Sequence, residues 1–236
     1  MEKKKGIIGK TIQSVLLVLF LVVMPLGSWY YLQSGFNYHK KALAELRDYG
    51  ELPTFALTDQ SGLPFTRDSL MGSIAIAGFF DRSDNSSKDL FHLVSRLHEQ
   101  FDDRKGILFL LHDLNANSSS SDLQQLANQH QLLDARQIRL LTSADSESMQ
   151  SLLQKGYRVP DMDKGRDEEG NFSFVPASSK VGEYPYLVIT DTKGGVRNYY
   201  TYNDIASQKR LIEHIALTMP RKDKKSSRRA TNQENL

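Results

Sequence analysis

The 236-residue sequence contains no cysteine. This absence excludes a disulfide framework, a cysteine zinc site, an iron–sulfur cluster and every reaction that requires a thiolate. The sequence also lacks a P-loop, a dinucleotide-binding glycine fingerprint and the serine nucleophile elbow of many hydrolases. None of the large enzyme classes that depend on these motifs is therefore indicated.

A strong net charge is also missing, because 30 Lys and Arg face 28 Asp and Glu, giving +2. The charge is uneven along the chain. Residues 1–10 carry +3 and residues 221–236 carry +4, which leaves −5 for residues 11–220. Basic residues do not cluster on the part that can fold, so we expect no nucleic-acid partner.

One long apolar run, residues 11–32, predicts a transmembrane helix, because about 20 apolar residues cross the hydrocarbon of a bilayer. No charge lies between Lys10 and His39, and aromatic residues 29–31 stand at the distal end of the run. Four lysines precede it, which predicts a cytoplasmic N-terminus and a C-terminal domain outside. A cleaved signal peptide is the alternative. We favour the anchor because the run is long and no A-x-A cleavage motif follows it.

The remaining sequence divides into four segments. Residues 1–10 form a basic cytoplasmic segment, and residues 33–50 predict a linker helix that ends at Gly50. Residues 51–219 predict one domain. Residues 220–236 are polar, basic and without apolar periodicity, which predicts a disordered tail.

Within residues 51–219, strand-like and helix-like patterns alternate. This alternation predicts an α/β fold with a parallel sheet, helices on its faces and antiparallel strands at the edges. The expected elements are a hairpin at 55–66 that turns at Ser61–Gly62, strands at 73–80, 106–112, 138–143, 185–191 and 196–202, a hairpin turn at 192–195, and helices at 86–101, 121–133, 146–157 (ended by Gly156) and 204–219.

Four stretches in this order resemble a known family. They are residues 52–80, with the pattern P-x-F-x-L-x-D-x-x-G, and residues 109–132, 138–159 and 184–215. Their order resembles the thioredoxin-like superfamily and, within it, the Sco/SenC family, over residues 50–219. Members of that family are membrane-anchored copper-handling factors for cytochrome c oxidase assembly. The resemblance implies a thioredoxin-like sandwich with an N-terminal hairpin, preceded by one transmembrane helix.

The functional residues of that family are missing. Its Cys-x-x-x-Cys pair lies on the loop after the first core strand, where the resemblance places Ser83 and Ser87. Its copper-ligand histidine falls at about Glu183, and no histidine lies between residues 131 and 213. Copper(I) is soft and selects sulfur ligands, and a hydroxyl has no reversible disulfide couple. We therefore expect the scaffold without thiol redox and without the usual copper site, and we predict no cofactor.

Pro185, just before a predicted core strand, resembles the cis-proline of thioredoxin-like folds. It has two interpretations. One is docking of a substrate backbone, and the other, which we favour, is a turn that sets the strand.

Other polar residues are weaker candidates for a site. His92 and His98 are separated by about 120° around one predicted helix, which is a poor shared face for a metal. His112 and Asp113 end a strand, and we expect them to be structural. Residues 161–172 contain five acids, but their spacing does not match an EF-hand loop. The glycosylation sequons at Asn85, Asn117 and Asn171 matter only in a eukaryotic secretory route.

The sequence thus favours a non-enzymatic binding or assembly factor. We expect a single-pass protein of a bacterial inner membrane, with its domain on the periplasmic side and with respiratory oxidase subunits or copper-assembly factors as partners. Two alternatives are a copper-handling protein with other ligands and a domain retained only as a spacer. A third is a carrier or enzyme with a rebuilt oxygen-ligand metal site made of Asp81, Ser83, Asp84, Ser87 and Glu183 beside Pro185.

Overall fold

A computed structural model describes residues 3–82, 87–115, 118–143, 145–159 and 186–219. The chain forms two compact units, Met1–Glu45 and Leu46–Leu236.

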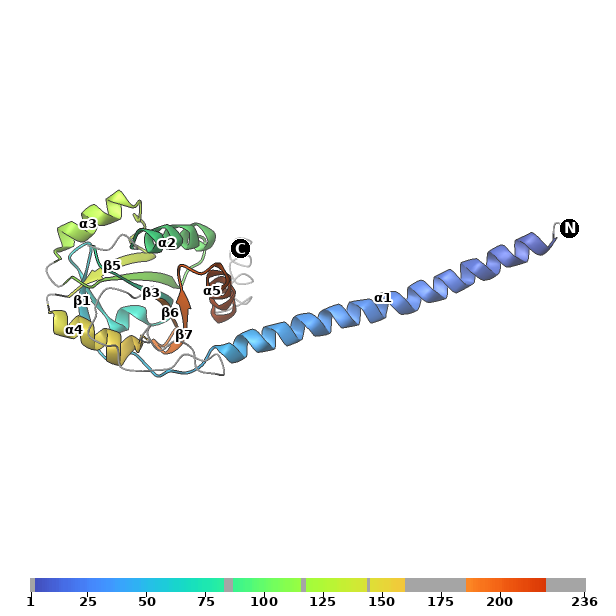
Figure 1. Ribbon diagram of the computed structural model, residues 1–236, viewed down its shortest axis with the longest axis horizontal. Coiled ribbons are helices and arrows are strands. Elements are labelled where there is room, and N and C mark those ends of the chain that lie inside the picture. Colours follow the sequence, from blue (N-terminus) through green and yellow to red (C-terminus); the bar gives the residue numbers. More distant parts are fainter. Residues whose placement is uncertain (1–2, 83–86, 116–117, 144, 160–185, 220–236) are drawn as a thin grey trace, which may run out of the picture. The chain divides into compact units, whose positions relative to one another are not determined.

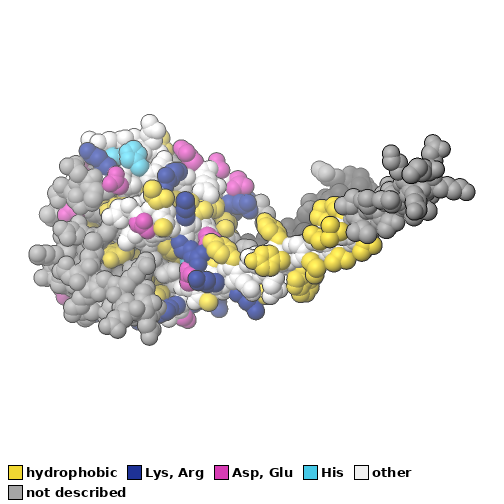
Figure 2. Space-filling view, turned by 45° about the vertical axis from the view of Figure 1, so that its right-hand side comes forward, with side chains coloured by type: hydrophobic (Ala, Val, Ile, Leu, Met, Phe, Trp, Pro, Cys, Tyr) yellow, Lys and Arg dark blue, Asp and Glu magenta, His cyan; other side chains and the backbone are white. Residues whose placement is uncertain are grey.

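The first unit contains one long helix, α1 (Lys3–Glu45), with Pro25 inside it (Figure 1). Its described side chains from Leu17 to Leu32 are exposed, and Figure 2 shows apolar groups along it. The stretch Leu17–Glu45 contains an 18-residue window with a mean hydropathy of 1.4, and it is the one helix among the described residues that is long and apolar enough to cross a membrane. The predicted membrane helix and the start of the predicted linker helix are therefore continuous.

The prediction that the linker helix ends at Gly50 is wrong, because α1 ends at Glu45. The residues that follow run alongside strand β7 (Val196–Thr201) instead. The amide of Arg47 donates to the carbonyl of Arg197 and that of Tyr49 to the carbonyl of Val196, both at 3.0 Å. These hydrogen bonds pair backbone groups at the outer edge of β7. If helix α1 continued to Gly50, those groups would be left unpaired.

The second unit is built on a seven-stranded sheet with the order β2-β1-β5-β4-β3-β6-β7. Strands β3, β4 and β5 are parallel to one another, and every other neighbouring pair is antiparallel. This architecture confirms the predicted α/β fold with its N-terminal hairpin. The strands are β1 (Ala56–Asp59), β2 (Pro64–Thr66), β3 (Ile74–Phe80), β4 (Ile107–Asp113), β5 (Ile138–Thr142), β6 (Tyr186–Thr190) and β7.

Helices cover both faces of this sheet (Figure 1). Helices α2 (Ser87–Phe101), α3 (Ser120–Gln129) and α5 (Ile205–Thr218) pack on the face that carries Ile74 and Ile76 of β3. Helix α4 (Ser146–Ser151) and a π-helical turn (Leu152–Tyr157) pack on the face that carries Ala75 and Ala77. Alternate residues of β3 thus enter two separate cores, and the whole strand is buried, as its continuous apolar run predicts.

Two helix ends differ from the predictions. Helix α3 ends at Gln129 instead of continuing to 133, and Gln131 takes a left-handed backbone conformation with φ of 58°. Gly156 does not end the third helix but lies inside the π-helical turn, and the left-handed residue is Arg158, with φ of 50°. Gly156 allows close packing, since a Cβ there would lie 3.1 Å from Cδ of Pro53.

Candidate functional site

The candidate site lies at the edge of the sheet where the central parallel strands end. Phe80 is the last residue of β3 and is in register with Asp113, the last residue of β4. Strand β6 runs antiparallel to β3 and begins at the same edge, with Leu187 opposite Gly78. In α/β folds, ligands bind at the carboxyl ends of such strands.

An ion pair joins the two strand ends. The Nε–H of Arg82, which follows β3, donates to Oδ2 of Asp113 at 2.8 Å, and the Asp113 side chain is fully buried. The same carboxylate accepts bonds from the hydroxyl of Ser118 at 2.5 Å and the amide of Asn115 at 3.0 Å. A buried carboxylate is stable when it is paired and hydrogen-bonded in this way. Arg82 therefore ties the loop after β3 to the loop after β4.

Ser87 is the first residue of α2 and is 6% exposed. Its hydroxyl donates to the carbonyl oxygen of Asp81 at 2.7 Å. This bond connects the start of the loop after β3 to the first turn of α2. Ser87, one of the two positions where the resemblance places the family's cysteines, therefore carries a hydroxyl that is already engaged by the backbone.

His112 and Tyr157 form a fully buried polar pair on the opposite face of the sheet. Nε2 of His112 lies 3.0 Å from the Tyr157 hydroxyl, and the imidazole stacks on Phe79 with ring centroids 5.3 Å apart. Burial lowers the pKa of His112 to about 3 and raises the pKa of Tyr157, so both groups are neutral at physiological pH. The structural role predicted for His112 and Asp113 agrees with these buried contacts.

The histidines of α2 have different surroundings. Nε2 of His98 lies 3.2 Å from Oδ2 of Asp134, whereas His92 is exposed. No group of three or more His, Asp or Glu side chains that could hold a metal occurs within the described part of the chain.

The other predicted site positions lie outside the described residues. These are Ser83, Asp84, Glu183 and Pro185, together with residues 161–172 and 220–236 and the sequons at Asn85, Asn117 and Asn171. Of the predicted oxygen-ligand cluster, the structure brings Asp81 and Ser87 together. The cis isomer of the bond before Pro185 stays a prediction.

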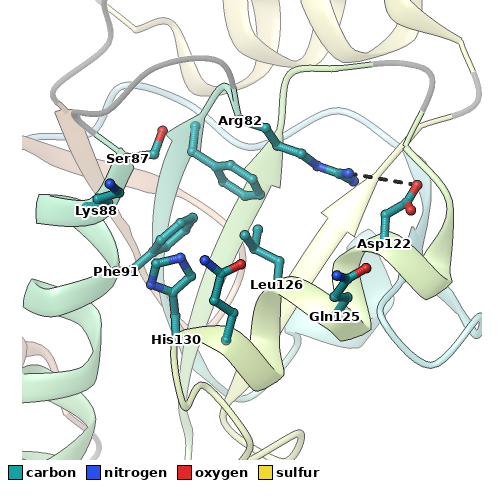
Figure 3. Close-up of a pocket in the computed structure, with 10 residues that line it drawn as sticks. Arg82, Ser87, Lys88, Phe91, Asp122, Gln125, Leu126 and His130 are labelled. Carbon is teal, nitrogen blue, oxygen red and sulfur yellow. Dashed lines mark ion pairs between the residues drawn. The ribbon is translucent and has the colours of Figure 1, made fainter.

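A pocket of about 330 Å³ opens beside this site, between α2 and α3. Figure 3 shows Arg82 and Asp122 at one end of it, and Lys88, Phe91 and His130 at the other. The imidazole of His130 lies against the ring of Phe91, with centroids 4.6 Å apart. The lining residues come from the end of β3, the first turns of α2 and one face of α3: Phe80, Arg82, Ser87, Lys88, Phe91, Asp122, Gln125, Leu126, Gln129 and His130.

Neither Arg82 nor this pocket was predicted from the sequence. A signal for the ion pair was present, because Arg82 follows one buried strand and Asp113 ends the next, and parallel neighbours end at the same edge. The pocket carries no comparable sequence signal, since it depends on the distance between two helices.

The central parallel strands, the N-terminal hairpin and the helices on both faces define a thioredoxin-like domain of the kind found in Sco/SenC proteins. A SCO1/SenC family lipoprotein from Bacillus anthracis str. Ames is 16% identical over 71% of this chain and 94% of its own, with a TM-score of 0.53. BsSco, a member of the Sco family of cytochrome c oxidase assembly proteins, is 14% identical over 73% and 95%, with a TM-score of 0.55.

Yeast Sco1 with copper bound is 18% identical over 73% of this chain and 92% of its own, with a TM-score of 0.51. No family model and no curated protein matches the sequence. At these identities the likeness establishes the fold, and the absence of cysteine distinguishes this chain from a protein with the Cys-x-x-x-Cys pair.

Proposed function

We propose that this chain is a membrane-anchored, Sco-like binding or assembly factor that works without thiol redox chemistry and without the usual copper ligands. Two observations support the link to respiratory oxidase. The domain has the Sco fold, and one of the solved structures it resembles belongs to a family of cytochrome c oxidase assembly proteins. We infer a role in binding, not in catalysis.

The ion pair of Arg82 with Asp113 carries the proposal. A guanidinium lies 2.8 Å from the buried carboxylate at the end of β4, where positive charge opposes the entry of a metal cation. The nearby Ser87 hydroxyl is a hard, neutral donor that is engaged by a carbonyl. Copper(I) prefers thiolate and thioether ligands, so the described residues of this site do not fit it. An ion pair and a hydrogen bond thus stabilise this edge of the sheet.

The anchor belongs to the same proposal. Helix α1 contains an apolar stretch of sufficient length, and the lysines before it favour a cytoplasmic N-terminus. We propose that the domain stands on the periplasmic side of a bacterial inner membrane.

Co-purification from native membranes tests this function. The full chain, carrying an affinity tag, is solubilised in a mild non-ionic detergent, and the retained proteins are identified by mass spectrometry. A tagged chain of residues 1–45 is the matched control, because it keeps α1 and lacks the domain. We expect oxidase subunits or copper-assembly factors with the full chain only. Recovery of the same unrelated proteins from both samples would refute the proposal.

A further inference from the structure

We propose that the pocket between α2 and α3 binds a segment of a partner protein in which an acidic side chain stands next to an apolar one. This inference deepens the proposed function, because it takes the domain to be a binding module and assigns the surface and the chemistry of its partner. The pocket, at about 330 Å³, falls in the size range of about 300–1,000 Å³ that is usual for ligand sites.

The floor of the pocket is apolar and fixed. Phe80 and Phe91 are 2% and 3% exposed, and their rings meet edge to face with centroids 5.1 Å apart. Leu126 of α3 is partly buried and packs against the same core. A rigid aromatic floor accepts an apolar side chain at little entropic cost, since its own side chains are already ordered.

The end of the pocket near α2 is basic. Lys88 has no ion-pair partner among the residues that the structure describes. The pKa of His130 is lowered by burial and, in addition, by the charges of His92 and Lys88. Lys88 is therefore the cation at this end of the pocket, in a body that carries −5 over residues 11–220. A carboxylate placed between Lys88 and His130 would pair with the ammonium group and favour the protonated form of the imidazole.

The charged side chains at the opposite end of the pocket already have partners within the domain. Arg82 pairs with Asp113 and, at 3.8 Å, with Asp122. Asp122 also accepts bonds from the amide and hydroxyl of Ser119 at 2.9 and 2.8 Å, as part of the α3 cap. Both charges at this end are therefore already engaged, so the carboxylate of the ligand belongs at the end formed by Lys88 and His130.

The wall along α3 favours a peptide over a small organic acid. Gln125 and Gln129 line the pocket, and their side-chain amides have no hydrogen-bond partner within the described part of the domain. An amide side chain can both donate to and accept from a peptide backbone. A small acid would use the basic end alone and leave this wall unused.

The test is an NMR titration of the full chain in non-ionic micelles, following the imidazole of His130. The probe is the peptide acetyl-Leu-Glu-Phe-Glu-amide, compared with acetyl-Leu-Gln-Phe-Gln-amide and with butyrate. We expect the acidic peptide to bind at least tenfold more tightly than either comparison ligand and to raise the pKa of His130.

Variants locate the binding. Lys88→Gln and Leu126→Gln should each weaken the acidic peptide at least fivefold, because they remove the charge and the apolar floor separately. Lys105→Gln is the control, because Lys105 is exposed and does not line the pocket. Equal binding of the acidic and amide peptides, unchanged binding by Lys88→Gln, or butyrate binding as tightly as the peptide would overturn the inference.

Its failure is distinguishable from failure of the proposed function. If oxidase components co-purify with the chain but the peptide does not bind, the function stands and the pocket assignment is wrong. If the peptide binds and no oxidase component co-purifies, the pocket assignment stands and the proposed partner is wrong.

Discussion

The buried imidazole of His112 makes the stability of the domain depend on pH, and replacing it by glutamine tests this. The pKa of His112 is lowered to about 3 from an ordinary value of 6.5, because burial removes the charged form from water. In the unfolded chain the imidazole of His112 takes up a proton below about pH 6.5, whereas in the folded domain it does so only near pH 3. Between these two values the unfolded state binds more protons, so stability falls as the pH falls.

The size of the effect follows from the pKa shift. Each pH unit within this window costs about 1.4 kcal/mol of unfolding free energy. From about pH 6.5 to pH 4 the contribution of His112 is therefore roughly 3 kcal/mol. His112→Gln removes this titration, and an amide can still form a hydrogen bond with the Tyr157 hydroxyl. We expect the variant to lose roughly 3 kcal/mol less than the parent chain over the same pH range.

The assay is urea unfolding of the full chain in non-ionic micelles at pH 7, 6, 5 and 4, with linear extrapolation to water. Near-UV circular dichroism reports the packed tyrosines of the domain. Tryptophan fluorescence does not serve, because the single tryptophan, Trp29, lies in α1. His92→Gln is the matched control, since His92 is exposed. If the parent chain and His112→Gln lose stability in parallel between pH 7 and pH 4, the argument from burial is refuted.

Two further predictions concern the sheet edge. Arg82→Met should destabilise the domain by about 3–5 kcal/mol, because it leaves the buried carboxylate of Asp113 unpaired, and the double variant Arg82→Met/Asp113→Asn should recover most of that loss in urea unfolding. The triple variant Ser83→Cys, Ser87→Cys and Glu183→His should gain copper(I) affinity by at least a hundredfold over the parent chain in a competition assay with a chromogenic chelator, because thiolates are soft ligands.

Each of these has an outcome that contradicts it. Arg104→Met is the control for the ion pair, because the pair of Arg104 with Asp103 is exposed and should contribute less than about 1 kcal/mol. A double variant as unstable as Arg82→Met would show that charge pairing at Asp113 does not explain the loss. Tight copper(I) binding by the parent chain would contradict the assignment of a site without soft ligands.

The sequence predicted the central elements of the fold because each had a local cause. The apolar runs at 73–80 and 106–112 became the buried parallel strands β3 and β4, and the turn at Ser61–Gly62 became the hairpin between β1 and β2. Gly62 takes a φ of 77°, which a left-handed turn position favours. Such signals act over a few residues and need no knowledge of the rest of the chain.

The structure corrected the predictions where distant residues compete with local preference. Gly50 looked like a helix stop, but the segment after Glu45 pairs with β7, more than 140 positions further along the chain. Gly156 also looked like a helix stop, but it lies inside a π-helical turn, and Leu52 and Pro53 pack against it there. In both cases hydrogen bonding or packing with a remote segment decided the conformation.

For the candidate site, the sequence by itself determined what chemistry is excluded, because the absence of cysteine removes thiolate ligands and disulfide exchange whatever the fold. Only the tertiary structure decided what stands there instead. It places the Arg82 guanidinium against the Asp113 carboxylate, and the face of α3 opposite the first turns of α2. These contacts arise because parallel strands end at one edge and two helices share one face of a sheet, which no single segment of the sequence specifies.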